Sequence, residues 1–151
     1  MRTLRIAWDA GWMIAGLVLV LLSVAGSAAG DLALGTRTVV VEGGGRYIDM
    51  EAPALARMLA RKDFTLINVH VPYEGDIRGT DLSVPFDRVG DQLDRLPPDR
   101  SAKLVVYCRS GRMSTIAARE LVARGYTNVW HLAGGMLAWV RAGYPIVGAP
   151  R

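Results

Sequence analysis

Apolar residues along the chain alternate between a spacing typical of strands and one typical of helices. Short β-branched or apolar runs predict buried strands at residues 64–69, 103–107 and 128–132. Apolar residues three and four positions apart predict helices at residues 51–62, 114–124 and 136–142. We expect Asp49 or Glu51 to lead the first helix. Because strands and helices follow one another in turn, the pattern predicts an α/β fold with a central parallel sheet flanked by helices on both faces.

The stretch after the first predicted strand has a weaker pattern. Residues 70–81 are rich in Gly, Pro and charge, so we expect a long loop there. Residues 83–86 predict a brief strand, and Asp87 is expected to cap a short helix that two consecutive prolines end. Ligands of open parallel sheets bind beyond the carboxyl ends of the strands. Cys108 follows the strand at 103–107 directly, so it is expected to lie at such a place.

An uncharged apolar run opens the chain. Residues 10–30 contain no charged side chain, and two arginines precede them. A basic start, an apolar run and a small-residue end are typical of an export signal. The run is also long enough to remain in a bilayer as a hydrophobic helix. Residues 1–29 are therefore expected to be either a signal peptide or a membrane anchor formed by residues 10–29. Both alternatives place the remainder in the periplasm or another extracytoplasmic space.

The next segment is expected to connect this start to the compact domain. Residues 30–46 end in a run of three glycines and predict a linker. Within it, residues 38–41 are β-branched enough to form a short edge strand. The compact domain is then expected to span residues 47–151.

Composition narrows the chemistry that the domain can perform. The chain has 151 residues, with a single cysteine and two histidines. One cysteine excludes an internal disulfide and any multi-cysteine zinc or iron–sulfur site, and two histidines leave few ligands for a transition metal. No metal or cofactor is therefore expected. The formal net charge is +4, and the basic residues alternate with acidic ones instead of forming a block. This pattern argues against a nucleic-acid partner.

The loop that begins at the cysteine carries the clearest candidate chemistry. A strand delivers Cys108 into a tight loop and a helix follows at once, so backbone N–H groups are expected to converge on the sulfur. Their partial positive charge, together with two arginines, favours the thiolate. We therefore expect Cys108 to be a reactive, catalytic thiol. The expected substrate-binding residues are the other members of the loop: Arg109, Ser110, Gly111, Arg112, Met113 and Ser114.

Four sequence blocks resemble, in the same order, those of the rhodanese-like sulfurtransferase family. They are residues 66–70, 75–80, 108–114 and a C-terminal group at 125–129, 134–139 and 142–146. The resemblance covers about residues 47–147 and implies a rhodanese-like domain. It implies that Cys108 attacks the outer sulfur of a small anionic donor such as thiosulfate, releases sulfite and becomes a persulfide. A thiol, cyanide or a cysteine of a partner protein then accepts the sulfur, without a cofactor.

Several positions depart from the family pattern. Asn68 and His70 stand where the family usually has Asp and Arg, and Asp76 and Arg78 stand where it usually has His and Pro. Met113 stands where an arginine is more common. The nucleophile itself is unaffected, so these departures bear on the substrate range and on the electrostatics of the loops.

The two histidines have different expected roles. His70 ends the strand beside the cysteine strand, so it is a candidate base for a Cys–His pair, or else a residue that supports a loop. His131 lies within a predicted strand beside Trp130 and is expected to be structural.

Two other functions use a similar loop. Phosphatases and arsenate reductases have Cys, five residues and then Arg, whereas the sixth residue after Cys108 here is Ser114, which argues against them. A persulfide carrier without turnover, or a redox-sensing module at the membrane, fits the same residues and stays open as the alternative.

Overall fold

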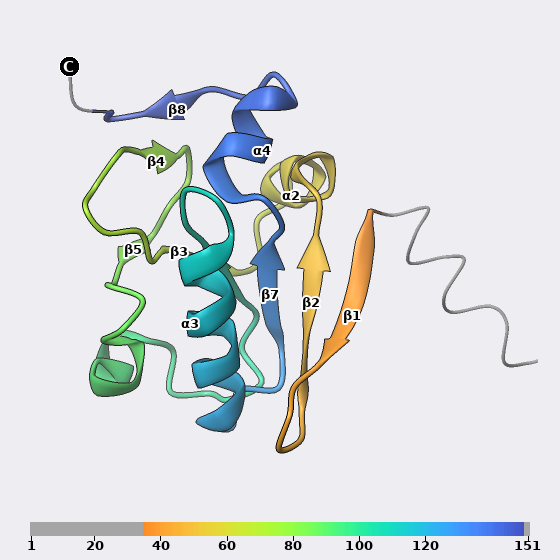
Figure 1. Cartoon of the computed structure of the whole chain (residues 1–151), viewed down its shortest axis with the longest axis vertical. Helices are drawn as coiled ribbons and strands as arrows, with labels where there is room; N and C mark the ends of the chain where they lie inside the picture. The colour runs from red at the N-terminus through yellow and green to blue at the C-terminus, as the bar shows by residue number, and fades with distance from the viewer. Residues whose placement is uncertain (1–34, 150–151) are drawn as a thin grey trace, which may run out of the picture.

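A computed structural model describes residues 35–149 of the chain, whose centre is a mixed sheet (Figure 1). The sheet has six strands in the order β1-β2-β7-β6-β3-β5. Their bounds are β1 Thr36–Val40, β2 Arg46–Met50, β3 Thr65–Asn68, β5 Leu82–Ser83, β6 Leu104–Tyr107 and β7 Val129–Leu132. Strands β2, β7, β6, β3 and β5 are parallel to their neighbours, and only β1 pairs antiparallel, with β2. The predicted central parallel sheet is therefore confirmed, with one antiparallel edge strand.

Three α-helices within residues 35–149 cover the two faces of this sheet. They are α2 Ala52–Leu59, α3 Arg112–Ala123 and α4 Gly135–Arg141. Side chains alternate between the faces along β6: Val106 packs in the apolar cluster that contains α3, and Val105 packs in the cluster that contains α2 and α4. In Figure 1 helix α3 lies across the front of the sheet, apart from α2 and α4. The apolar character of β6 on both faces is what a doubly covered parallel strand requires.

The β1–β2 hairpin corrects the prediction for the segment before the domain. Residues 36–46 were expected to belong to a linker. Residues 36–45 instead form β1 and the turn, Arg46 begins β2, and Val39 pairs with Tyr47. The predicted edge strand is present and begins two residues earlier than expected. The three glycines form its hairpin turn, where the Gly44 N–H donates to the carbonyl of Val41 at 3.1 Å. Glycine-rich sequence suits a tight turn as well as a linker, and the pairing with β2 decides between them.

Several shorter elements also differ from the pattern-based predictions. Asp49 lies inside strand β2, so Glu51 alone precedes helix α2. The helix expected after Asp87 is two short 3₁₀ turns, η1 Val89–Asp91 and η2 Leu93–Arg95. Gly90, in the first of these turns, lies close to side chains of α3: a Cβ at this position would come 2.5 Å from Glu120 Oε1. Two two-residue strands, β4 Asp76–Ile77 and β8 Ile146–Val147, pair outside the main sheet.

The expected N-terminal hydrophobic segment, residues 10–29, lies outside the described residues. Among residues 35–149, no helix has the length and apolar character that crossing a membrane requires.

Candidate active site

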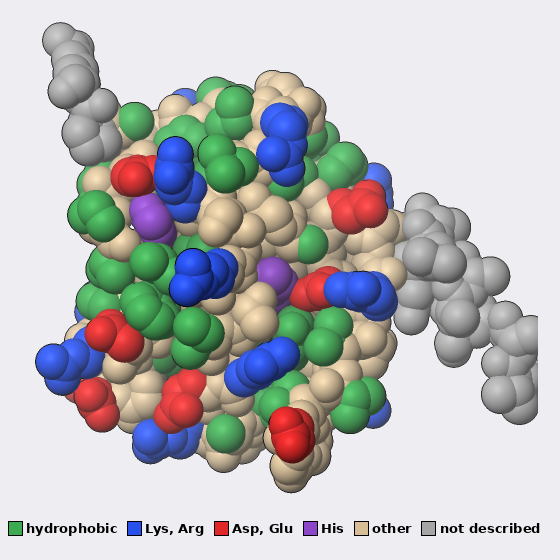
Figure 2. All heavy atoms as spheres, in the orientation of Figure 1, with side chains coloured by type: hydrophobic (Ala, Val, Ile, Leu, Met, Phe, Trp, Pro, Cys, Tyr) green, Lys and Arg blue, Asp and Glu red, His purple; other side chains and the backbone are tan. Residues whose placement is uncertain are grey.

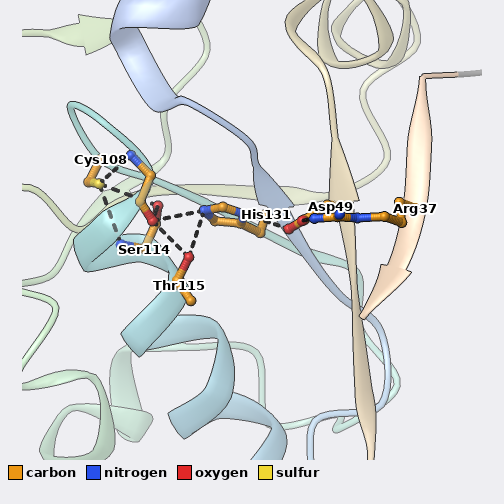
Figure 3. Close-up of polar contacts among 7 residues, drawn as sticks. Arg37, Asp49, Cys108, Ser114, Thr115 and His131 are labelled. Carbon is orange, nitrogen blue, oxygen red and sulfur yellow. Dashed lines mark hydrogen bonds and ion pairs between the residues drawn. The ribbon is translucent and has the colours of Figure 1, made fainter. Parts of the chain in front are cut away.

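The sulfur of Cys108 lies at the carboxyl end of β6, just before α3, and three groups donate to it. The N–H of Gly111 lies 3.1 Å from Sγ, and the N–H and Oγ of Ser114 each lie 3.4 Å from it (Figure 3). Hydrogen bonds to sulfur are longer than those to oxygen, and several donors around one sulfur stabilise negative charge on it. Cys108 itself is 1% exposed. The cradle of N–H groups expected around the cysteine is present.

Gly111 contributes to this cradle with both its N–H and its carbonyl. It directly precedes α3 and has a left-handed backbone with φ of 91°, which favours glycine. Its carbonyl accepts a hydrogen bond from Thr115 Oγ1 at 2.9 Å. Ser114 Oγ lies 3.2 Å from the same carbonyl, so its single proton is shared between this oxygen and the sulfur. The same residue therefore donates to the sulfur with its N–H and anchors the first turn of α3 with its carbonyl.

A chain of polar side chains supports the Gly111 carbonyl from the sheet. His131 Nε2 lies 3.1 Å from that carbonyl oxygen, and His131 Nδ1 lies 2.7 Å from Asp49 Oδ1. Asp49 Oδ2 in turn pairs with Arg37 Nη2 at 2.6 Å (Figure 3). His131 and Asp49 are opposite one another in the parallel pair β7 and β2. His131 thus has the structural role that was expected, and it acts on the cysteine loop.

Sequence patterns did not indicate that Asp49 and Arg37 belong to this support. Both come from the hairpin that was expected to be partly a linker and partly a helix start. The available signal was the β-branched stretch before the glycines, but a single sequence does not reveal which strand pairs with which.

Helix α4 holds the cysteine loop from the opposite side. The N–H of Met136 donates to the carbonyl of Cys108, and the N–H of Leu137 donates to the carbonyl of Arg109, both at 2.9 Å. Gly135 makes this close approach achievable, because a Cβ there would lie 2.2 Å from the carbonyl oxygen of Cys108. The first turn of α4 therefore fixes the backbone of the nucleophile.

A pocket of about 370 Å³ opens beside the cysteine. Its lining residues are His70, Phe86, Cys108, Arg109, Ser110, Arg112, Met113 and Ile116. All seven residues predicted for the site thus lie together: four line the pocket with Cys108, and Gly111 and Ser114 contact the sulfur. The pocket has an apolar wall, from Phe86, Met113 and Ile116, and a basic wall that includes two arginines. A pocket with an apolar wall and a basic wall suits a small ligand that has one anionic end and one less polar end.

The residues that depart from the family pattern come from two places near this pocket. Asn68 ends strand β3, and His70, Asp76 and Arg78 follow it in the segment before β5. Met113 lies in α3 and lines the pocket. Asn68 Nδ2 donates to the carbonyl of Gly75 at 3.0 Å and to Asp76 Oδ1 at 2.9 Å, so two of these residues hold the loop. The backbone N–H of His70 donates to Asn68 Oδ1 at 2.9 Å. The His70 side chain makes no hydrogen bond to the sulfur or to a loop. Two roles were predicted for His70, base for the cysteine and support for a loop. Among the described residues, its side chain forms no hydrogen bond that would serve either role.

Basic and acidic side chains are mixed on the face that carries α3 (Figure 2). Arg109 Nε pairs with Glu74 Oε2 at 2.9 Å, and Arg124 Nε pairs with Glu120 Oε1 at 2.8 Å. Both of these arginines therefore have a local acidic partner.

Known proteins are similar to the part of the chain that contains this cysteine loop and the sheet around it. The family model described as "Rhodanese-like domain" matches residues 51–142, which is more than half of the chain. The chain belongs to the rhodanese-like domain family.

Curated relatives of this rhodanese-like domain include sulfurtransferases. A sulfurtransferase of Allochromatium vinosum is 35% identical over 103 residues, which cover 66% of this chain and 94% of that protein. A tRNA uridine(34) hydroxylase of Erwinia tasmaniensis is 30% identical over 98 residues, covering 61% of this chain and only 28% of that protein. The domain therefore also occurs as a small part of larger proteins, and similarity supports sulfur transfer in general terms.

Solved structures show the same fold. The rhodanese-like domain of an Anabaena protein is 25% identical, with a TM-score of 0.59, over 66% of this chain and 78% of that one. A rhodanese-related protein from Thermoplasma volcanium is 26% identical, with a TM-score of 0.57, over 66% of this chain and 96% of that one.

Proposed function

We propose that the protein is a sulfurtransferase that moves sulfane sulfur from a donor such as thiosulfate to a thiophilic acceptor through a persulfide on Cys108. The observation that carries the proposal is the arrangement of three donors, from Gly111 and Ser114, around one buried sulfur beside an open pocket. These donors favour an anionic sulfur, which is the nucleophilic form of cysteine.

The first step loads the enzyme with sulfur. The Cys108 thiolate attacks the outer sulfur of thiosulfate, a new S–S bond forms, and the old S–S bond breaks with its electron pair leaving on sulfite. The persulfide that results carries its negative charge on the outer sulfur, and we expect the N–H groups of the cysteine loop to stabilise it. Arg109 and Arg112, both exposed at the pocket, attract the anionic donor and offer N–H groups to its oxygens.

The second step removes the sulfur from Cys108. A nucleophilic acceptor, which is cyanide, a thiol or a cysteine of a partner protein, attacks the outer sulfur of the persulfide. The S–S bond to Cys108 breaks, and the thiolate is restored. Because the two substrates react in turn with one nucleophile, the kinetics are expected to be ping-pong.

One observation favours a second candidate, a persulfide carrier that does not turn over with small molecules. Cys108 is the only cysteine in the sequence, and its side chain is almost completely buried. The chain therefore has no second thiol to resolve its own persulfide, and a partner protein would have to remove the sulfur.

Turnover separates these candidates. Thiosulfate and cyanide are supplied to the wild-type protein and to Cys108→Ala, and thiocyanate is measured. The enzyme predicts many turnovers per wild-type chain and none for the variant. One equivalent of sulfur per chain, released only to a thiol protein, would support the carrier. Equal inactivity of both proteins with thiosulfate and with other persulfide donors would contradict the enzyme.

We also propose that the domain works outside the cytoplasm. The support is the basic start and the uncharged run at residues 10–30. Cell fractionation with N-terminal sequencing tests this: a mature chain that begins at Ala28 or Gly30 indicates a cleaved signal, and an intact N-terminus in the membrane fraction indicates an anchor. An intact chain in the cytoplasm would contradict export.

A further inference from the structure

His70 lies at the wall of the active-site pocket, and among residues 35–149 its side chain has no hydrogen-bond partner. Its side chain is 8% exposed, and both ring nitrogens are buried without a hydrogen bond. Buried polar atoms are almost always satisfied in folded proteins, because leaving them unpaired costs free energy. An imidazole in this state beside Cys108 and Arg109 therefore indicates a donor whose partner arrives with a ligand.

One carboxylate already lies between His70 and an arginine of the cysteine loop. Glu74 Oε2 accepts from Arg109 Nε at 2.9 Å, and Glu74 Oε1 lies 3.6 Å from His70 Nε2. The first contact has the length of a charge-assisted hydrogen bond, and the second is too long for one. Glu74 thus satisfies Arg109 and leaves His70 unsatisfied.

The position of this carboxylate is one that accommodates negative charge. Two side chains that carry N–H donors, from different loops, converge on it at the rim of the Cys108 pocket. Glu74 is itself 42% exposed, so it can turn into solvent without burying its charge. Arg112 lines the same pocket and adds positive charge nearby.

We propose that Arg109 and His70 form the subsite for the oxyanion end of the sulfur donor, and that Glu74 occupies this subsite in the free protein as an internal competitor. The inference rests on the proposed function, because it takes the bound anion to be the donor. A sulfonate end carries three oxygens in a tetrahedral arrangement. It can therefore reach both Arg109 and His70, which a planar carboxylate held by Arg109 does not.

This arrangement selects the chemical class of the donor. Thiosulfate and organic thiosulfonates place a sulfonate-type group next to the sulfur that is transferred, whereas uncharged polysulfides have no oxygen to offer. Binding of an anionic donor exchanges one ion pair of Arg109 for another and satisfies His70. Binding of an uncharged donor leaves Glu74 in place.

Binding to a chain that cannot react tests the subsite apart from turnover. In the Cys108→Ala background, the dissociation constant of thiosulfate is measured by calorimetry for Glu74→Gln, His70→Leu and Glu120→Gln. Glu120→Gln is the matched control, because Glu120 is a similarly exposed carboxylate that pairs with Arg124 away from the pocket. Dimethyl trisulfide is the uncharged probe.

The expected result is a pattern of opposite changes. Glu74→Gln binds thiosulfate about two- to five-fold more tightly, the range expected for removal of an exposed competing ion pair. His70→Leu binds it about ten-fold more weakly, because a hydrogen bond to a charged group is lost. Glu120→Gln changes thiosulfate binding by less than two-fold, and none of the three substitutions changes the binding of dimethyl trisulfide.

Equal tightening by Glu74→Gln and Glu120→Gln would overturn the proposal, because net charge alone would then explain the effect. Weaker binding by Glu74→Gln would also overturn it, since Glu74 would then only position Arg109. The comparison of Glu74→Gln with Glu120→Gln tests the proposal even if His70→Leu fails to fold. Thiosulfate binding as expected, with no sulfur gained by wild-type Cys108, would instead overturn the proposed function and leave the anion subsite supported.

Discussion

At the scale of single residues, the reactivity of the site depends on what surrounds one sulfur atom. Ser114 contributes both its N–H and its hydroxyl to Cys108 Sγ, and its hydroxyl also reaches the Gly111 carbonyl. Thr115, the next residue, donates its hydroxyl to the same carbonyl and makes no hydrogen bond to the sulfur. Both hydroxyls therefore reach the Gly111 carbonyl, and only that of Ser114 also reaches the sulfur.

Replacement of Ser114 by alanine is expected to slow persulfide formation from thiosulfate about five-fold to ten-fold, because one donor to the anionic sulfur is lost. Thr115→Val, which keeps the shape of the side chain, is expected to change this rate less than two-fold. Single-turnover release of sulfite measures both. Equal slowing in the two variants would show that the hydroxyl of Ser114 acts only through the loop.

The cysteine loop could be predicted from the sequence because its residues are contiguous. A strand, a cysteine, a glycine and a helix start fix one another's positions over seven residues, so spacing alone brings them together. The support from His131 and Asp49 could not be predicted in this way. These two residues are 82 positions apart, and their contact depends on β2 lying beside β7, which no local pattern encodes.

At the scale of elements, the start of α4 locks the nucleophile to the rest of the domain. The N–H groups of Met136 and Leu137 take the carbonyls of Cys108 and Arg109 as their acceptors. The helix N-terminus leaves these N–H groups without partners inside α4, so the cysteine loop completes the helix and the helix fixes the loop. Gly135, whose φ is 56°, stands at the point of contact.

Gly135→Ala is expected to destabilise the domain by about 3 kcal/mol or more, because the new Cβ collides with the backbone at Cys108 and the left-handed φ adds strain. Gly143→Ala is the matched control: its φ is 90°, and no neighbouring atom of the described residues lies within 4 Å of the position that its Cβ would take. That change is expected to cost only about 1–2 kcal/mol. Urea unfolding measures both, and equal losses would contradict the packing argument.

The loop between β3 and β5 is tied to the sheet by Tyr107 of β6. Its hydroxyl accepts from the Ile77 N–H and donates to Asp76 Oδ1, each at 3.0 Å. Burial raises the pKa of the Tyr107 phenol well above its ordinary value. The folded state therefore holds a proton that the unfolded state releases above about pH 10. Stability from this group is complete below that pH and is lost as the pH rises further.

The wild-type free energy of unfolding is thus expected to fall above pH 10 more steeply than that of Tyr107→Phe, by up to about 1.4 kcal/mol per pH unit. At pH 7 the variant is expected to be less stable by about 1–3 kcal/mol, because the Ile77 N–H loses its acceptor. Urea titrations at pH 7, 10 and 11 measure both effects. Parallel pH dependence in the two proteins would contradict a buried, protonated phenol.

The longer strands and helices could be predicted because their apolar residues face a core on a regular period. The 3₁₀ turns after Asp87 and the two-residue strands β4 and β8 could not. Such elements contain too few residues to show a regular spacing of apolar positions, and their positions depend on how the longer elements pack. Strand β1 was recognisable as a strand, but its place in the sheet depends on its pairing with β2.

At the scale of the whole molecule, one rhodanese-like domain brings together three separate regions at Cys108. The hairpin β1–β2 supports the loop through Asp49 and His131, helix α4 holds its backbone, and the segment after β3 supplies His70 to the pocket wall. The nucleophile is thus rigid and buried at its base while its pocket is open. A firmly held sulfur beside an open pocket suits the proposed transfer of a single sulfur atom between substrates that arrive in turn.

Mass spectrometry of the protein after incubation with thiosulfate tests the central claim most directly. We expect wild-type chains to gain one sulfur atom, mapped to the peptide that contains Cys108, together with one equivalent of released sulfite. Cys108→Ala is predicted to gain none and to release none. Absence of added sulfur on wild-type Cys108 with thiosulfate and with other sulfane donors, or equal addition in the variant, would contradict it.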